Sequence, residues 1–161
     1  MSEMYRALEL ACELATRPGF DDLHDPVKAT PLIEAYHDPV GFPTQGYGRL
    51  LSRQRWAPLD RWPAITAETA WEWLQQDMRK AMAAVARLIT VPLTAHQAAA
   101  LADFAFNCGP GNLEVSTLRR VINRGDYSAA PAQFRRWVYA GPVKLPGLVR
   151  RRAAEVEMWQ A

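Results

Sequence analysis

A carboxylate and a hydroxyl in one glycine-containing stretch are the side chains of this sequence best placed to do chemistry. Asp38 stands directly before Pro39, and Thr44 follows six residues after Asp38, with Gly41 between them. A tight turn that contains glycine can bring two such side chains to one place. Asp38 also has a second interpretation, because an Asp before a Pro is typical of a turn residue whose side chain caps the backbone.

Histidine and cysteine indicate no metal or redox chemistry. The three histidines, His24, His37 and His96, share no metal-ligand spacing, so we expect surface or hydrogen-bonded roles for them. Cys12 and Cys108 match no metal-binding or redox motif. We expect two free, largely buried thiols, with a disulfide as the alternative. The sequence therefore predicts a protein that works without a metal or an organic cofactor.

The segments around this stretch predict the elements that would position it. Residues 35–50 place glycines among polar and aromatic residues, which predicts a small β-hairpin or meander. Helical periodicity predicts a first helix over residues 3–16 and a long amphipathic helix that starts after an N-cap at Thr66 and ends near Pro92. Further helices are expected over residues 95–107, 117–124, 130–139 and 148–160.

Together these elements predict an α+β fold that is mainly α. We expect a single domain, residues 1–161, with an N-terminal lobe that carries the β-hairpin (1–65), a connecting helix (66–92) and a helical lobe (93–161). A small lobe joined by a long helix to a helical lobe would leave a cleft between them, where ligands commonly bind.

Composition and charge exclude several function classes. The net charge of +2 suits an anionic polymer, but it is too weak to indicate nucleic-acid binding. No stretch approaches the ~20 apolar residues of a membrane span. The N-terminus carries charges throughout and lacks the apolar core of a signal peptide, so we expect synthesis in a cytoplasm.

The hairpin stretch resembles a known family signature. Residues 35–48, AYHDPVGFPTQGYG, are similar to the β-hairpin of the phage lysozymes, glycoside hydrolase family twenty-four, whose core is an Asp, a Thr six residues later and then Gly-Tyr-Gly. Residues 92–109, 116–118 and 145–159 resemble later parts of the same family, in the same order. The resemblance covers nearly the whole chain and implies a lysozyme-like fold.

The resemblance implies an endolysin that hydrolyses the β-1,4 bond between N-acetylmuramic acid and N-acetylglucosamine in bacterial peptidoglycan. Such cleavage normally uses two carboxyl groups across the scissile bond. By resemblance, Asp38 is the ionised carboxylate that steers a water, and the Thr44 hydroxyl holds that water. Asn107, Ser116 and Thr117 would contact the glycan, although Asn107 is also explained as a helix C-cap and the other two as N-cap residues.

The family's general acid has no direct counterpart in this sequence. In the family it is a Glu at the end of the first helix, followed by Gly and an apolar residue, and the matching tripeptide here puts Pro18 in its place. Counting back from the hairpin without gaps reaches Ala29, which cannot donate a proton either. Glu13 is our first candidate for a substitute acid, and Asp21, with its neighbour Asp22, is the second. Without any acid, the alternative function is a catalytically silent protein that binds peptidoglycan.

The resemblance also implies a route to the substrate. An endolysin made in the host cytoplasm would pass the membrane through a holin-type pore and act at the cell wall, in the periplasm. We expect a monomer that binds peptidoglycan strands and no nucleic acid. Among the tryptophans, Trp56 and Trp62 are the two that we consider near a ligand. The run Arg150–Arg152 in the last helix predicts a solvated, ion-paired surface, with contact to an anionic wall or membrane as the alternative.

Overall fold

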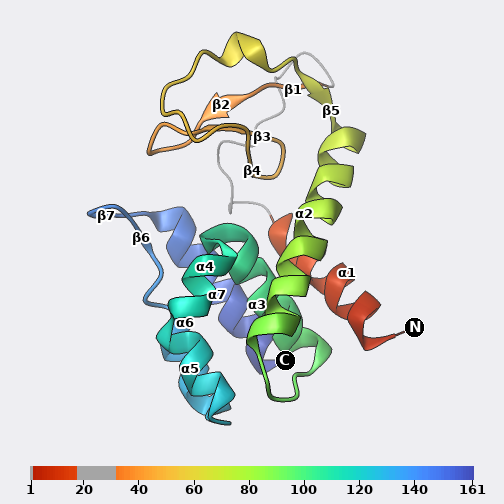
Figure 1. Cartoon of the computed structure of the whole chain (residues 1–161), viewed down its shortest axis with the longest axis vertical. Coiled ribbons are helices and arrows are strands. Elements are labelled where there is room, and N and C mark those ends of the chain that lie inside the picture. The colour runs from red at the N-terminus through yellow and green to blue at the C-terminus, as the bar shows by residue number, and fades with distance from the viewer. Residues whose placement is uncertain (1, 18–31) are drawn as a thin grey trace. The chain divides into compact units, whose positions relative to one another are not determined.

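The structure is a computed structural model that describes residues 2–17 and 32–161 (Figure 1). The described part is mainly helical and contains three small antiparallel sheets, which confirms the predicted α+β, mainly α fold. Contacts along the chain define two compact units. One, here called the sheet unit, is Asp21–Asp77, and the other, the helical unit, consists of Met1–Phe20 and Met78–Ala161.

The predicted hairpin forms the main sheet of the sheet unit. Strands β2 (Tyr36–His37), β3 (Pro43–Gln45) and β4 (Arg49–Leu50) pair antiparallel in this order. The turn from β3 to β4 contains Gly46 at φ 67° and Gly48 at φ 94°, in the left-handed region that favours glycine. The sequence pattern over residues 35–50 therefore predicted this meander correctly.

A second pair of strands and a buried glutamine complete the sheet unit. Strand β1 (Leu32–Ile33) pairs antiparallel with β5 (Ile65–Thr66), and the short helix η1 (Leu59–Arg61) precedes β5 in the chain. Gln45 on β3 is 1% exposed, and its amide donates to the carbonyl oxygens of Ile33 and Pro63, each at 3.0 Å. These two hydrogen bonds fix β3 to the segments around β1 and β5.

The long predicted helix is α2 (Ala67–Leu88). Thr66 caps it as predicted, because its hydroxyl oxygen accepts the backbone N–H of Thr69 at 3.1 Å. Arg49 on β4 forms two hydrogen bonds of 2.8 Å with the carboxylate of Asp77 on α2. Its guanidinium also lies 4.6 Å from the ring centroid of Trp73. These contacts hold the meander against the first part of α2.

The helical unit is built around α3 (Ala95–Cys108), which α1 (Glu3–Ala15) and α7 (Pro146–Gln160) both contact (Figure 1). A capping box of Thr94 and Gln97 starts α3. The buried face of α1 contacts α3, so α1 groups with the helical unit, and the predicted N-terminal lobe 1–65 is divided between the two units. The remaining helices are α4 (Pro110–Val115), α5 (Thr117–Asn123), η2 (Tyr127–Ala129) and α6 (Ala130–Phe134).

Two predictions for the C-terminal third were wrong. Residues 130–139 do not form one helix: α6 ends at Phe134, and β6 (Tyr139–Ala140) pairs with β7 (Val143–Lys144) through a turn at Gly141, whose φ is 58°. In the arginine run, Arg151 is 5% and Arg152 0% exposed, so only Arg150 fits a solvated surface. A helix packed on both sides can bury arginines when carboxylates lie opposite them.

Two smaller findings concern the cysteines and membrane spans. Cys12 is a buried free thiol and Cys108 a half-buried one, in agreement with the sequence analysis. Burial raises the pKa of Cys12 to about 11, so this thiol is not poised to react.

Within residues 2–17 and 32–161, no helix combines the length and the apolar character needed to cross a membrane.

Candidate active site

Asp38 occupies the turn between β2 and β3. Its Oδ1 accepts the backbone N–H groups of Val40, at 3.0 Å, and Phe42, at 2.7 Å. The turn-capping interpretation of Asp38 is therefore correct for Oδ1. The side chain is half-buried, and among the described residues nothing hydrogen-bonds to Oδ2. One carboxylate oxygen thus fixes the side chain, and the other remains available to a ligand.

Thr44 lies on β3 and is 6% exposed. Its hydroxyl donates to the carbonyl oxygen of Phe42 at 3.0 Å. Because the hydroxyl proton is used there, the lone pairs of Oγ1 remain free to accept a hydrogen bond. Asp38 binds the N–H of Phe42 and Thr44 binds its carbonyl oxygen. The structure therefore brings the two predicted residues together around one backbone residue.

Trp56 lies against the same turn. Its ring is 66% exposed, its centroid lies 5.1 Å from that of His37, and its backbone N–H donates to the carbonyl oxygen of Gly41 at 2.7 Å. A Cβ on Gly41 would lie 2.5 Å from the indole, so a side chain at this position would displace Trp56. Trp56 is the only non-glycine residue of the described part with a positive φ, 59°. Such strain costs about 1–2 kcal/mol and is found most often at functional sites.

Asn107 lies one residue before the end of α3, whose C-cap is Gly109, and its amide has a defined orientation. Its Oδ1 accepts Nη2 of Arg152 at 2.9 Å, whereas the side chain as a whole is exposed. Because the oxygen is held by a buried guanidinium, the NH₂ group is left to donate to a ligand. Arg152 also reaches the carbonyl oxygen of Trp137 at 3.5 Å, so it connects the end of α3 to the segment after α6.

Ser116 and Thr117 begin α5 beside a surface groove of about 340 Å³. Ser116 is 3% exposed and donates to the carbonyl oxygen of Leu113, while it accepts the N–H of Arg119. These contacts support the capping role of Ser116 and leave it no proton for a sugar. Thr117 accepts from Arg120 at 2.8 Å and keeps its hydroxyl proton. The groove is lined by Val115, Ser116, Thr117, Gln133, Arg136 and Trp137.

The candidates for the general acid are only partly described. Glu13 lies near the end of α1, and its side chain is exposed to solvent. A proton donor near neutral pH needs partial desolvation to raise its pKa, which an exposed side chain lacks. Pro18, Asp21 and Asp22 lie outside the described residues. The identity of the acid therefore stays a prediction.

A buried cluster of charged residues was not predicted from the sequence. It consists of Asp103 on α3 and Arg151, Arg152 and Glu155 on α7, each at most 5% exposed. Arg151 binds the Asp103 carboxylate through two hydrogen bonds of 2.9 and 2.7 Å. A signal did exist, because Asp103 interrupts an otherwise apolar stretch of α3 and Arg152 precedes Glu155 by one helical turn. Through Arg152, the cluster also binds the amide oxygen of Asn107.

Comparison with known proteins finds relatives of this chain in sequence and in fold. The sequence profile of the phage lysozyme family matches residues 32–155. A SAR-endolysin of Escherichia phage Mu is 44% identical over 86 residues, which are 53% of this chain and 50% of that protein, so the match spans half of this relative's length. An endolysin of Acyrthosiphon pisum secondary endosymbiont phage 1 is 35% identical over 133 residues, 80% of this chain and 87% of that protein. The solved muramidase domain of SpmX from Asticaccaulis excentricus has a TM-score of 0.72 at 28% identity, covering 94% of this chain and 95% of that one.

These likenesses define a protein with the lysozyme fold. The chain belongs to the phage lysozyme family, since the family profile matches most of its length. The predicted class of activity, a muramidase of the endolysin type that hydrolyses peptidoglycan, is confirmed. The alternative, a catalytically silent glycan binder, is not favoured. The roles of the individual site residues stay predictions.

Proposed function

We propose that Asp38 is the general base of this muramidase and that Thr44 positions the attacking water. The observation that carries the proposal is that both side chains are fixed on Phe42 with acceptor atoms left over, Oδ2 of Asp38 and the lone pairs of Thr44 Oγ1. A water that donates one hydrogen to each acceptor directs its own lone pairs toward a third point. An anomeric carbon at that point would meet an oriented nucleophile, which is the work required of the base in glycoside hydrolysis.

The proton for the leaving oxygen comes, in this proposal, from a carboxyl group N-terminal to the region that matches the family. The match begins at residue 32, so the segment where the family carries its Glu lies outside it. Glu13 is the first candidate, because it lies on the first helix, and Asp21 is the second. To serve, Glu13 must lose part of its solvent exposure when glycan binds. Positioned acid catalysis contributes roughly 10²–10⁴-fold, so one of these groups is needed for useful lysis.

The glycan strand is held, in this proposal, by an aromatic surface and by amide and hydroxyl donors. Trp56 offers an exposed indole beside Asp38, and the apolar face of a sugar ring can stack on such a surface. Asn107 offers its NH₂ group, and Thr117 its hydroxyl proton in the groove at the start of α5. Ser116 acts on the glycan only indirectly, by capping the helix that carries Thr117.

The route to the wall and the oligomeric state belong to the same proposal. The protein passes the inner membrane through a holin-type pore and works as a monomer on strands of peptidoglycan in the periplasm. Expressing it in a Gram-negative host with and without a holin tests the route, since lysis should need the pore. Light scattering on the purified chain tests the monomer.

The products of digestion test the proposed activity. Purified peptidoglycan sacculi are incubated with the protein, and the released fragments are reduced and analysed by mass spectrometry. A muramidase leaves N-acetylmuramic acid at every new reducing end. Fragments that end in N-acetylglucosamine would assign a different glycosidase specificity, and intact sacculi that retain bound protein would restore the silent-binder alternative.

A further inference from the structure

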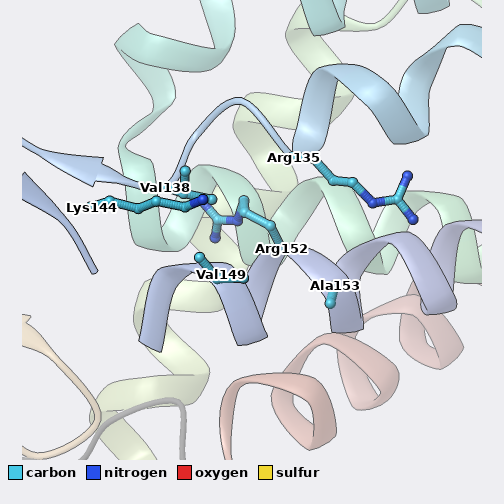
Figure 2. Close-up of a pocket in the computed structure, with 6 residues that line it drawn as sticks. All are labelled: Arg135, Val138, Lys144, Val149, Arg152 and Ala153. Carbon is cyan, nitrogen blue, oxygen red and sulfur yellow. The ribbon is translucent and has the colours of Figure 1, made fainter. Parts of the chain in front are cut away.

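A hollow on the helical unit is lined by none of the residues proposed for catalysis. It has a volume of about 230 Å³ and lies between the β6–β7 hairpin and α7. Its walls combine apolar side chains with three cationic ones, namely Arg135, Val138, Lys144, Val149, Arg152 and Ala153 (Figure 2). No acidic residue of the described part lines it. A small hollow lined by cations without acids is typical of a binding site for an anion.

Arg152 contributes an unused donor to this hollow. The residue is 0% exposed, and its two terminal nitrogens are occupied by Asn107, Cys108 and Glu155, with Trp137 at 3.5 Å. Its Nε–H has no hydrogen-bond partner within the described structure. A buried N–H of a guanidinium without an acceptor is costly, and in native proteins such a group usually has a ligand or ion as its partner.

The charge balance behind the hollow favours an anion as well. Asp103 is matched by Arg151 through a bidentate ion pair. Burial raises the pKa of Glu155, against the opposing effect of Arg152, and the negative charge of Asp103 adds to the rise. The raised pKa makes Glu155 a weaker counter-charge for Arg152 in the interior.

Lys144 supplies a second cation from the opposite wall. In Figure 2 the Lys144 side chain extends from β7 toward the guanidinium of Arg152, between Val138 and Val149. Arg135 points away from this pair, so it adds positive charge at the rim but no contact in the hollow. Lys144 is exposed and can move its ammonium group to meet a ligand.

We propose that this hollow binds a phosphate group, with Arg152 Nε–H and the Lys144 ammonium as its donors and Val138, Val149 and Ala153 as its walls. A phosphate presents several acceptor oxygens in a tetrahedral arrangement, so it can accept from two donors that approach from different elements. It also carries between one and two negative charges near neutral pH, which matches the two cations. A free phosphate ion and the headgroup of a phospholipid share this chemistry, and the apolar walls can accept the carbon chain next to a phosphodiester.

Nitrogen-15 NMR on the whole chain provides a direct test, because each arginine Nε–H gives its own signal. Inorganic phosphate, the short-chain lipid dihexanoyl phosphatidylglycerol and acetate are titrated separately at constant ionic strength. We expect a saturable shift of the Arg152 Nε–H signal with inorganic phosphate, with the lipid or with both, and a weaker response to acetate. A response to the lipid alone would identify the headgroup as the source of the phosphate.

Two surface variants locate the site without removing the buried arginine. Lys144→Gln should weaken phosphate binding roughly tenfold, since a hydrogen bond to a charged group is lost. Ala153→Phe, on the exposed face of α7, should fill the hollow and abolish the shift. The matched control is Lys80→Gln, an exposed lysine on α2 outside the hollow, which should bind as the unchanged protein does.

Three results would overturn the proposal. The first is the absence of a saturable shift at Arg152 with either phosphate compound. The second is an equal response to acetate, which would show that the site has no preference for phosphate. The third is an equal loss of binding in Lys144→Gln and Lys80→Gln, which would reduce the effect to the general charge of the surface.

Discussion

At the level of single residues, the proposed roles depend on hydrogen bonds that use one atom of a side chain and leave another free. Asp38 and Thr44 are both anchored on Phe42, and Asn107 is anchored on Arg152. The types of these residues were readable from the sequence through its resemblance to the phage lysozymes. Which atom of each stays free was not, because that depends on the path of the backbone through the turn.

The Thr44 hydroxyl should affect turnover more than binding. Thr44→Val keeps the shape of the side chain but removes the acceptor for the water, so we expect the rate of sacculus digestion to fall at least about tenfold. Glycan affinity, measured by co-sedimentation with sacculi, should stay within about twofold. Thr44→Ser restores the hydroxyl and should recover most of the rate. A parallel loss of binding and turnover would instead make Thr44 a substrate contact or a residue of the fold.

The opposite pattern is expected for Trp56. Trp56→Ala removes the exposed indole beside Asp38, and we expect KM for soluble glycan fragments to rise about three- to tenfold with a nearly unchanged kcat. Trp56→Phe keeps an aromatic surface and should lie between the two. Quenching of tryptophan fluorescence by glycan fragments gives an independent measure of stacking. A KM that does not change in Trp56→Ala would remove this residue from the glycan site.

At the level of helices and strands, the sequence predicted the features that depend on local pattern. It missed those that depend on contacts between distant parts of the chain. The turn glycines marked the meander, and the capping residue Thr66 marked the start of α2. The helix predicted over 130–139 failed, because residues 139 and 140 pair with a strand beyond Gly141 rather than continue the helix. The arginines of α7 were assigned to the surface, because the carboxylate that binds Arg151 lies 48 residues away.

Two mutations in the charged cluster of α3 and α7 should differ greatly in their effect on stability. Asp103→Asn removes the buried negative charge that Arg151 binds through two hydrogen bonds and should lower the free energy of unfolding by about 3–5 kcal/mol at pH 7. Glu155→Gln imitates the protonated acid and still accepts from Arg152, so its cost should be about 1 kcal/mol or less. Urea unfolding at pH 7 measures both. A large loss in Glu155→Gln would show that the ionised form of Glu155 stabilises the fold.

The same two carboxyl groups give the fold opposite pH dependences. Desolvation favours a higher pKa for Asp103, but the charge and hydrogen bonds of Arg151, together with Glu155 and Arg152, outweigh it and lower the pKa. This contribution to stability therefore disappears as the pH falls below about 4. Burial raises the pKa of Glu155, so the folded state holds a proton that the unfolded state releases above about pH 4.3. The contribution of Glu155 to the free energy of unfolding therefore falls as the pH rises from about 4.3 toward its raised pKa. The stability of Glu155→Gln relative to the unchanged protein should increase over that range, and a constant difference would contradict the raised pKa.

At the scale of the whole molecule, the open question is which group donates the proton. The family match covers residues 32–155, which contain the meander and the helices from α2 to α6. The expected Glu position, occupied by Pro18, lies N-terminal to that match. The sequence shows that the family's Glu is missing from this position, but it does not identify a substitute acid. A substitute acid is defined by its position in space rather than along the chain.

Carboxyl substitutions near the N-terminus should identify the acid. If Glu13 donates the proton, Glu13→Gln should lower the rate of lysis by roughly 10²–10⁴-fold, whereas Asp21→Asn should have little effect. The reverse pattern would assign the role to Asp21. If neither these changes nor Asp22→Asn matter, the substitute-acid hypothesis fails, and Pro18→Glu should then create or increase lysis. Thermal unfolding of each variant shows whether the fold is intact.

Replacement of Asp38 by Asn shows whether this carboxylate is the general base. Asparagine keeps the Oδ1 acceptor that binds Val40 and Phe42. The free energy of unfolding, followed through the melting temperature, should therefore change by no more than about 1 kcal/mol. It cannot take a proton from water, so clearing of permeabilised Gram-negative cells should slow by at least about 10²-fold. Full lysis by a folded Asp38→Asn protein would contradict the assignment of Asp38 as the base.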